Sequence, residues 1–367
     1  MCAIAVFTAH AYVTLSFDGD WTGTEASVAL IVGRSALSFF FVLSGFVMTW
    51  SARPGDTATA FWRRRAAKIY PLHAVTWFAA LMLITWTGGQ VGIWQAVPNL
   101  LLVHSWSPAF DINTSVNEVS WSLSCEAFFY LSFPLLIRVL RRIPVRRLWA
   151  WTAGTTLAVI LLPLAASTLL PSQPTFPPFD ATFHQYWVVH LFPLTRLLEF
   201  VLGILLARAV LEGRFMRVRF RHVIAALAIA YPMALQVPFL YSITAVLIIP
   251  VVLLVVAAAG SDIRGSRSLV RGPVMVKPGD MTFAFYTVHL LVLQFMYRLI
   301  DDGGPASPGQ RLGSAALLFA VSLVLAWVMH TYLEQPLSRR WGSRRPPKAG
   351  SMPPVTPVRA SEEPVAP

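Results

Sequence analysis

The chain has 367 residues, of which 56% are hydrophobic and only 13% are charged. Its mean hydropathy of +0.61 excludes an ordinary soluble domain and indicates a polytopic membrane protein. The formal net charge of +12 would suit a nucleic-acid partner, but the basic residues lie in short runs between apolar segments. We therefore expect them to orient the chain in a lipid bilayer, and we expect no nucleic-acid partner.

Ten segments have the length and apolar character of membrane helices, which predicts an all-α bundle of about ten transmembrane helices. They are residues 3–17, 32–51, 70–87, 119–140, 148–170, 188–210, 222–239, 242–259, 281–300 and 312–333. The first has no charged leader and leads into further apolar segments, so we expect it to be a span and not a cleaved signal peptide.

The charges between these segments alternate along the chain. Lys and Arg gather after the second, fourth, sixth, eighth and tenth segments, as in the run Arg141, Arg142, Arg146 and Arg147. The first, third and fifth gaps hold no Lys or Arg and are acidic; only Arg311 interrupts the pattern. This alternation is what the positive-inside bias produces when both termini are cytoplasmic.

The segments outside the predicted spans differ in character. Residues 88–118 are aromatic-rich and are predicted to form an outer loop with a re-entrant or interfacial piece, and residues 171–187 to pack over the outer face. We expect residues 1–340 to form one membrane domain and the Pro-rich residues 341–367 a disordered cytoplasmic tail. Cys2 and Cys125 have no metal-ligand spacing, so we expect neither a disulfide nor a metal site.

Ionisable residues inside apolar segments are costly in a bilayer, at about 2.5–3.5 kcal/mol each, and therefore need a reason. His10 lies within "CAIAVFTAHAYVTL", where it makes either a helix–helix hydrogen bond or a catalytic contact. Glu126 lies within "VSWSLSCEAFFYLSFPLL", where structural pairing and direct catalysis both remain open. His289, in "FAFYTVHLLVL", is either a packed histidine or a second catalytic candidate.

Two further pairings are predicted from spacing. Arg196 and Glu199 are three residues apart and can form a self-neutralising pair on one helix face, with Gly203 allowing a close helix–helix approach. Glu334 stands before Pro336 at the predicted cytoplasmic end of the last helix, where it could pair with the basic cluster after the second segment.

That basic cluster is the run "AFWRRRAAKIYPLH". Arg63, Arg64, Arg65 and Lys68 fall within about one and a half helical turns, which we expect to end at Pro71. Such a cluster either only anchors the chain at the cytoplasmic surface or also binds a phosphate-bearing ligand, because guanidinium groups bind phosphate oxygens in a bidentate manner.

Six motifs together resemble the acyltransferase-3 family of integral membrane acyltransferases. They are "SALSFFFVLSGFVMTW", "FWRRRAAKIYPLH", "VSWSLSCEAFFYLSFPLL", "RLLEFVLGILLA", "FAFYTVHLLVL" and "TYLEQPL", in the order in which the family has them. The resemblance implies a ten-helix bundle in the cell (inner) membrane. It also implies transfer of an acyl group, usually acetyl from cytosolic acetyl-CoA, to a hydroxyl of a sugar, surface polysaccharide, peptidoglycan or secondary metabolite.

The family motifs map onto this sequence with two departures. The resemblance places the first-helix histidine at His10, the paired cations at Arg65 and Lys68, and the terminal carboxylate at Glu334. The family has an arginine eleven positions before this histidine, which here would fall before Met1, so we expect either that the true start lies upstream or that the first helix is truncated. Lys68 stands where the family has arginine, so the positive charge is kept but the bidentate binding that a guanidinium group offers to phosphate is lost.

These residues define a mechanistic hypothesis. Arg63, Arg64, Arg65 and Lys68 would bind the phosphates of acyl-CoA, and His10 would act as general base on the acceptor hydroxyl or as a nucleophile. Glu126 or Glu334 would orient the imidazole or the cations, with His289 as an alternative catalytic residue. The rival hypothesis is a transporter or flippase for a glycan or small metabolite, without acyl transfer. A membrane scaffold would not need buried ionisable groups.

Overall fold

The computed structural model describes residues 2–15, 23–52, 55–176, 179–214, 218–263, 279–300 and 307–342. All regular structure within these ranges is helical. The predicted disordered tail, residues 341–367, lies almost entirely outside them, as do several of the charged residues in the predicted gaps.

A helix occupies each of the ten predicted segments. The main helices are α1 (Cys2–Leu15), α2 (Thr24–Trp50), α3 (Ala58–Trp86), α6 (Ser120–Leu140), α7 (Leu148–Leu169), α9 (Pro193–Leu211), α10 (Phe220–Ala234), α12 (Ile248–Ile263), α14 (Thr282–Leu291) and α16 (Pro308–Met329). Shorter elements join them: α4 (Ile93–Leu100), η1 (His104–Trp106), α5 (Phe110–Asn113), η2 (Val145–Arg147), α8 (Phe183–Tyr186), η3 (Trp187–Leu191), α11 (Phe239–Ile243), η5 (Val292–Met296), α15 (Tyr297–Ile300), η6 (His330–Glu334) and α17 (Gln335–Gly342).

Seven helical stretches in the described part of the chain are long and apolar enough to cross a membrane. Helices α1 and α10 are apolar but shorter. Helix α9 has 19 residues and carries Arg196, Glu199 and Arg208, all of them buried. The structure therefore supports a multi-pass membrane protein, while the number of ten crossings and the cytoplasmic position of the termini remain predictions.

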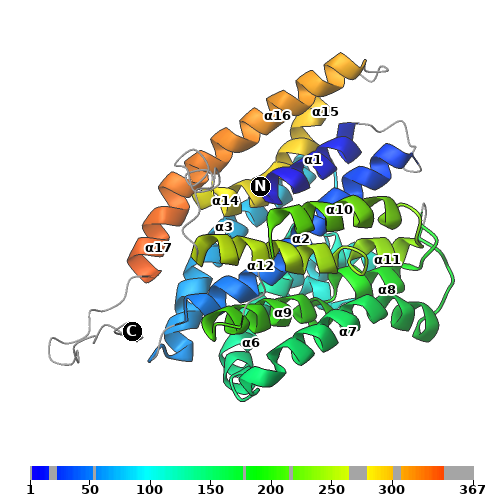
Figure 1. The fold of residues 1–367 in the computed structure, drawn as a ribbon. Helices are drawn as coiled ribbons and strands as arrows, with labels where there is room; N and C mark the ends of the chain where they lie inside the picture. The colour runs from blue at the N-terminus through cyan, green and yellow to red at the C-terminus, as the bar shows by residue number, and fades with distance from the viewer. Residues whose placement is uncertain are drawn as a thin grey trace, which may run out of the picture.

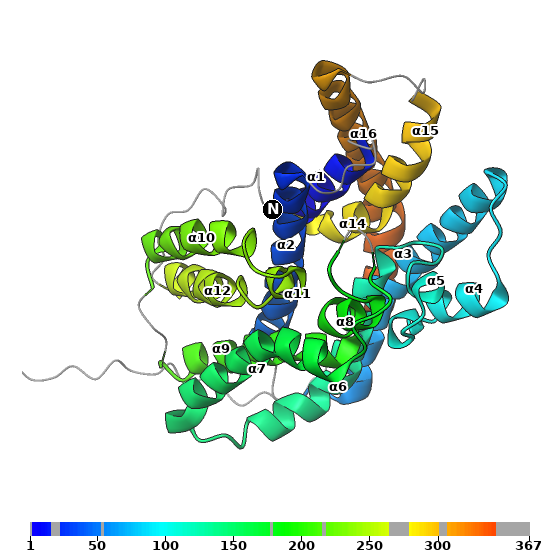
Figure 2. The same cartoon turned by 90° about the vertical axis from the view of Figure 1, so that its right-hand side faces the viewer.

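The long helices lie side by side around α2. Figure 1 shows α9 and α7 running alongside one another, with α2 partly behind α10 and α12 and α16 crossing obliquely at one edge. Figure 2 shows α10 and α12 together on one side of α2, and α3, α4 and α5 on the other. Helices α1, α14 and α16 pack against each other through Phe7, Phe285 and Phe319, whose rings lie 5.1–5.8 Å apart between centroids.

Helices α2 and α9 make backbone-to-backbone contact at two glycines. A Cβ placed on Gly203 would lie 1.9 Å from the carbonyl oxygen of Val42, and one on Gly45 would lie 2.0 Å from that of Phe200. No real side-chain atom fits at such distances, so both positions require glycine. The close approach predicted at Gly203 is confirmed, and it is reciprocal.

The segment between α3 and α6 forms a compact layer tied together by buried polar groups. The Asn99 side chain donates to the Ser115 carbonyl at 2.7 Å, and Ser120 bonds Asn99 at 3.2 Å. His104 is fully buried and bonds Ser120 at 3.2 Å. Phe110 contacts Phe176 and Phe183. Phe110 of the predicted outer loop 88–118 therefore packs against the 171–187 segment.

Helix boundaries differ from prediction where charged or proline residues continue a helix beyond its apolar run. Helix α3 begins at Ala58, so the basic cluster forms its first turns, and Pro71 lies inside the helix. The expectation that Pro71 ends this turn was wrong, because a proline inside a helix removes only one N–H and leaves the rest of the backbone bonding intact. Likewise Pro336 lies within α17, which follows η6 directly.

Candidate active site

His10 on α1 and His289 on α14 form a hydrogen-bonded pair. Their rings are stacked with centroids 5.2 Å apart and an interplanar angle of 10°, and His10 Nδ1 lies 2.9 Å from His289 Nε2. His289 is fully buried, whereas His10 is only partly buried. The structure thus brings together two of the four predicted catalytic residues, which are 279 positions apart in the sequence.

The hydrogen-bond partners assign the tautomers of both rings. His289 Nδ1 lies 2.7 Å from the backbone carbonyl of Tyr286, which can only accept a hydrogen bond, so this nitrogen carries a proton. Nε2 of a neutral His289 is then an acceptor, and the proton of the shared bond belongs to His10 Nδ1. Nε2 of His10 therefore holds its lone pair outside the pair, as a general base requires.

Packing fixes the orientation of the His289 ring. The ring lies parallel to that of Phe285, with an interplanar angle of 8° and a centroid distance of 5.9 Å. The hydroxyl of Tyr286 lies 2.6 Å from Ser122 Oγ and donates to the Val119 carbonyl at 3.2 Å, which ties α14 to the start of α6. The histidine pair is thus held between α1, α14 and α6.

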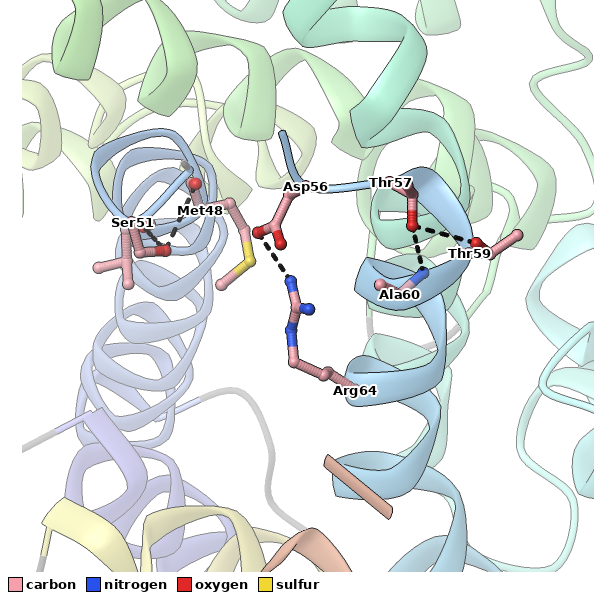
Figure 3. Close-up of polar contacts among 8 residues, drawn as sticks. Met48, Ser51, Asp56, Thr57, Thr59, Ala60 and Arg64 are labelled. Atoms are coloured by element: carbon pink, nitrogen blue, oxygen red, sulfur yellow. Dashed lines mark hydrogen bonds and ion pairs between the residues drawn. The ribbon is translucent and has the colours of Figure 1, made fainter. Parts of the chain in front are cut away.

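A second feature of the site is a cationic pocket of about 550 Å³ between the ends of α2, α3 and α6. Four arginines and Asp56 line it together with Phe61 and Phe133; the arginines are Arg64, Arg65, Arg138 and Arg141. Figure 3 shows Arg64 reaching from α3 to Asp56, in the segment that follows α2. Their ion pair measures 2.9 Å, with each side chain 23% exposed.

The predicted phosphate-binding residues divide into two groups. Arg64 and Arg65 line the pocket, and Arg65 Nε is buried with no hydrogen-bond partner among the described residues. Arg63 and Lys68 are exposed and are not among the pocket-lining residues. Lys68 lies deeper along α3 and interacts electrostatically with Glu126.

Glu126 lies between the pocket and the interior of the bundle. The Tyr130 hydroxyl donates a hydrogen bond to its carboxylate, and the Arg65 guanidinium lies 5.5 Å from the centre of the Tyr130 ring. Ser122 stands one turn earlier on α6 and bonds Tyr286, whose carbonyl holds His289. One face of α6 therefore presents polar groups from the pocket toward the histidine pair.

Glu334 is buried beside α3 but does not pair with the basic cluster in the described part of the chain. Its carboxylate lies 2.9 Å from His330 Nδ1, and the Gln335 amide bonds His330 Nε2 at 3.0 Å. The predicted pairing was therefore wrong, because the π-helical turn η6 places a histidine of the same helix next to the carboxylate.

Arg196 and Glu199 form the predicted buried pair, with an N–O distance of 3.0 Å and both side chains 2% exposed. Arg196 also donates to Ser38 on α2 at 3.4 Å. Arg34, which sequence reasoning overlooked, is 8% exposed, and its guanidinium lies 4.6 Å from the centre of the Phe239 ring. These arginines fasten α2 to its neighbours.

Sequence reasoning also missed Arg138 and Arg141 as pocket residues. The helical period could have identified them as neighbours of Glu126, because residues three or four positions apart share one face of a helix. This spacing links five residues along α6: Glu126, Tyr130, Pro134, Arg138 and Arg141. The contribution of Asp56 had no comparable signal, since Asp56 precedes α3 and pairs with an arginine eight residues later.

Comparisons with known proteins match the chain to an acyltransferase family. The Acyl_transf_3 family model, described as an acyltransferase domain, matches residues 1–331. Acyltransferase MdmB of Streptomyces mycarofaciens is 41% identical over 94% of this chain and 91% of its own length. The exopolysaccharide production protein ExoZ of Rhizobium meliloti is 26% identical over 86% of this chain and 92% of its own length.

Nodulation protein 10 of Rhizobium leguminosarum bv. viciae is 27% identical over a shorter region, 38% of this chain and 42% of its own length. No solved structure matches the chain. The family match covers the histidine pair, the cationic pocket and the polar face of α6 between them. The chain therefore belongs to the Acyl_transf_3 family of membrane acyltransferases.

Proposed function

We propose that this protein transfers an acyl group, most simply acetyl, from cytosolic acyl-CoA to a hydroxyl of a sugar, surface glycan or secondary metabolite. The observation that carries the proposal is the His10 ring, whose Nδ1 is engaged by His289 and whose Nε2 keeps its lone pair. The cationic pocket supports it, because guanidinium groups are suited to the phosphates of a CoA thioester. Family membership favours acyl transfer over the rival hypothesis of transport.

In the proposed reaction, His10 Nε2 accepts the proton of the acceptor hydroxyl while its oxygen attacks the thioester carbonyl. The tetrahedral intermediate then collapses with cleavage of the carbon–sulfur bond. The imidazolium returns its proton to the leaving thiolate, giving the ester and free CoA. His289 accepts the Nδ1–H bond throughout and keeps the His10 ring in its reactive orientation.

The same nitrogen can also serve as a nucleophile that takes the acyl group before passing it to the acceptor. The two routes predict different behaviour when no acceptor is present. A transient acyl-imidazole allows labelled CoA to exchange into unlabelled acetyl-CoA, whereas a general base allows no exchange. This measurement on the purified protein distinguishes them.

We assign donor binding to Arg64 and Arg65, with Lys68 acting deeper along α3 beside Glu126. Arg63 is exposed beside the pocket and adds to the local positive potential. Glu126 positions this inner cationic region, and Glu334 acts through His330 where η6 packs on α3. We further propose ten membrane crossings, cytoplasmic termini and a location in the cell membrane, in keeping with the alternating charges.

Two experiments test the proposed function. A deletion strain is compared with its parent by mass spectrometry of glycans and metabolites, and the proposal expects a product that lacks the mass of one acyl group. The purified protein is then assayed for transfer from labelled acetyl-CoA to that product. His10→Ala should lower kcat by about 10²–10⁴-fold. Full activity of His10→Ala, or no acyl-CoA consumption by the wild type with the accumulated acceptor, would contradict the proposal.

A further inference from the structure

The cationic pocket has two walls, and only one of them corresponds to a family motif. Arg64 and Arg65 come from α3, whereas Arg138 and Arg141 come from the end of α6. Against these four guanidinium groups stands one lining carboxylate, Asp56, so three positive charges remain uncompensated among the lining residues. The net positive charge of the two walls exceeds the negative charge of a single phosphate group.

The two walls lie at different depths. Helix α3 starts at Ala58 beside the pocket and runs into the bundle, whereas α6 runs outward and ends at Leu140. Arg65 lies over Tyr130, and Arg138 and Arg141 follow Tyr130 by eight and eleven residues. At 1.5 Å per residue these positions are about 12 and 16 Å farther along the α6 axis. Arg65 is thus the inner cation, and Arg138 and Arg141 form the rim.

The end of α6 that carries the rim arginines is held in place. Arg208 on α9 is 7% exposed, and its guanidinium donates to the carbonyls of Leu140 and, at 3.3 Å, Ile143. These carbonyls lie at the end of the helix, where backbone acceptors lack partners within it. The backbone that carries Arg138 and Arg141 is therefore anchored to the bundle.

The proposed reaction requires acyl-CoA to bind in this pocket in one orientation. Its thioester must reach His10 inside the bundle, so the pantetheine arm leads, the 5′-diphosphate follows and the 3′-phosphorylated ribose comes last. The diphosphate then meets Arg65, with Arg64 next to it, paired to Asp56 before the start of α3. The ribose at the far end from the thioester carries both the adenine and the 3′-phosphate, and these groups remain at the rim.

Resting on the proposed function, we propose that Arg138 and Arg141 bind the 3′-phosphate of the donor, so that the enzyme selects CoA thioesters over dephospho-CoA thioesters. In the described part of the chain neither arginine forms an ion pair, whereas Arg64 is bound to Asp56. The neighbouring Arg142 is exposed and does not line the pocket, so it serves as a matched control for general positive charge.

The test is equilibrium binding of radiolabelled CoA and dephospho-CoA to the purified full-length protein in detergent, which needs neither acceptor nor turnover. The wild type should bind CoA about 10- to 100-fold more tightly, the range of a charge-assisted contact to phosphate. The double variant Arg138→Ala/Arg141→Ala should lose this preference by weakening CoA binding and leaving dephospho-CoA binding unchanged. Arg142→Ala should keep it.

Equal binding of the two ligands by the wild type would overturn the assignment, as would a preference that survives in the double variant. Equal weakening of both ligands in the double variant would also overturn it, because the rim would then sense charge without distinguishing the 3′-phosphate. Size-exclusion profiles and melting temperatures of all variants identify a folding defect. A binding preference without acyl transfer would support this assignment while contradicting the proposed function.

Discussion

The imidazole rings of His10 and His289 are stacked and share a hydrogen bond of 2.9 Å between Nδ1 and Nε2. The bond has a direction, because His289 uses its other nitrogen to donate to the Tyr286 carbonyl. A ring held in this way cannot rotate to present the wrong nitrogen to the substrate. His289 is therefore a positioning residue for His10.

This arrangement predicts different outcomes for two substitutions of His289. His289→Leu removes the acceptor for His10 Nδ1–H and should lower kcat by about 10²-fold or more, with the donor KM little changed. His289→Gln offers a side-chain carbonyl in place of Nε2 and should recover part of the loss. Steady-state kinetics of both variants provide the measurement, and equal kcat for the two would show that His289 only fills space.

Asp56 is predicted to compete with the donor for Arg64. Asp56→Asn removes a carboxylate from a pocket proposed to bind phosphate, so the acetyl-CoA KM should fall, by up to about fivefold for a partly exposed ion pair. Added salt should shrink the effect, because it screens exposed charges. Arg65→Ala should move KM in the opposite direction.

Asp111→Asn provides the control for the Asp56 variant, because Asp111 is an exposed aspartate on α5, away from the pocket. A donor KM that rises in Asp56→Asn would mean that the carboxylate serves chiefly to orient Arg64. That result would contradict the prediction that Asp56 competes with the donor for Arg64.

The glycine contact between α2 and α9 predicts a large stability effect from a single methyl group. Gly203→Ala places a Cβ against the Val42 carbonyl and should destabilise the protein by about 1–3 kcal/mol or more, because the backbones must separate. Gly154→Ala on α7 is the matched control, since a Cβ there meets nothing within 4 Å and alanine favours the helix. Melting temperatures in detergent should fall for the first variant only; an unchanged value for Gly203→Ala would contradict the contact.

The buried pair on α9 predicts non-additive substitutions. Arg196→Met or Glu199→Gln alone leaves one group buried without its partner and should cost about 3–5 kcal/mol. The double variant should be more stable than at least one single variant, since no lone charge remains. A double-mutant cycle of thermal stability measures the coupling, and strictly additive losses would show that the two side chains act independently.

His104 predicts how stability depends on pH. Burial, together with the nearby His73, lowers the pKa of His104 to about 3. Below the ordinary value of about 6.5 the unfolded chain binds a proton that the folded chain does not, so stability falls as pH decreases from 6.5 toward 3. The loss from this residue should reach about 2 kcal/mol at pH 5.

Melting temperatures at pH 7 and pH 5 check the His104 prediction. His104→Gln should flatten the dependence, whereas the exposed His184→Gln should leave it as in the wild type. If both variants retained the wild-type slope, groups other than His104 would control the acid sensitivity.

The sequence located the helices well because long apolar runs are easily recognised, although only seven helical stretches in the described part of the chain are long and apolar enough to cross a membrane. It located helix ends poorly, since α3 extends through the basic cluster into a region where hydropathy falls but backbone hydrogen bonding continues. His10 and His289 could each be proposed from sequence, but their contact depends on how α1 and α14 pack, which no local pattern encodes. Glu334 shows the converse, because a partner four residues away on the same helix, His330, was present in the sequence and was overlooked.

The reciprocal glycine contact also constrains how relatives of this protein can diverge. Where two backbones touch, no change in a neighbouring side chain can compensate for a larger residue, because there is no side chain to trim. Selection for a new acceptor should therefore leave Gly45 and Gly203 untouched and act on the helices that surround this fixed core. A library that randomises both glycines should yield few folded clones, whatever acceptor is used to screen it.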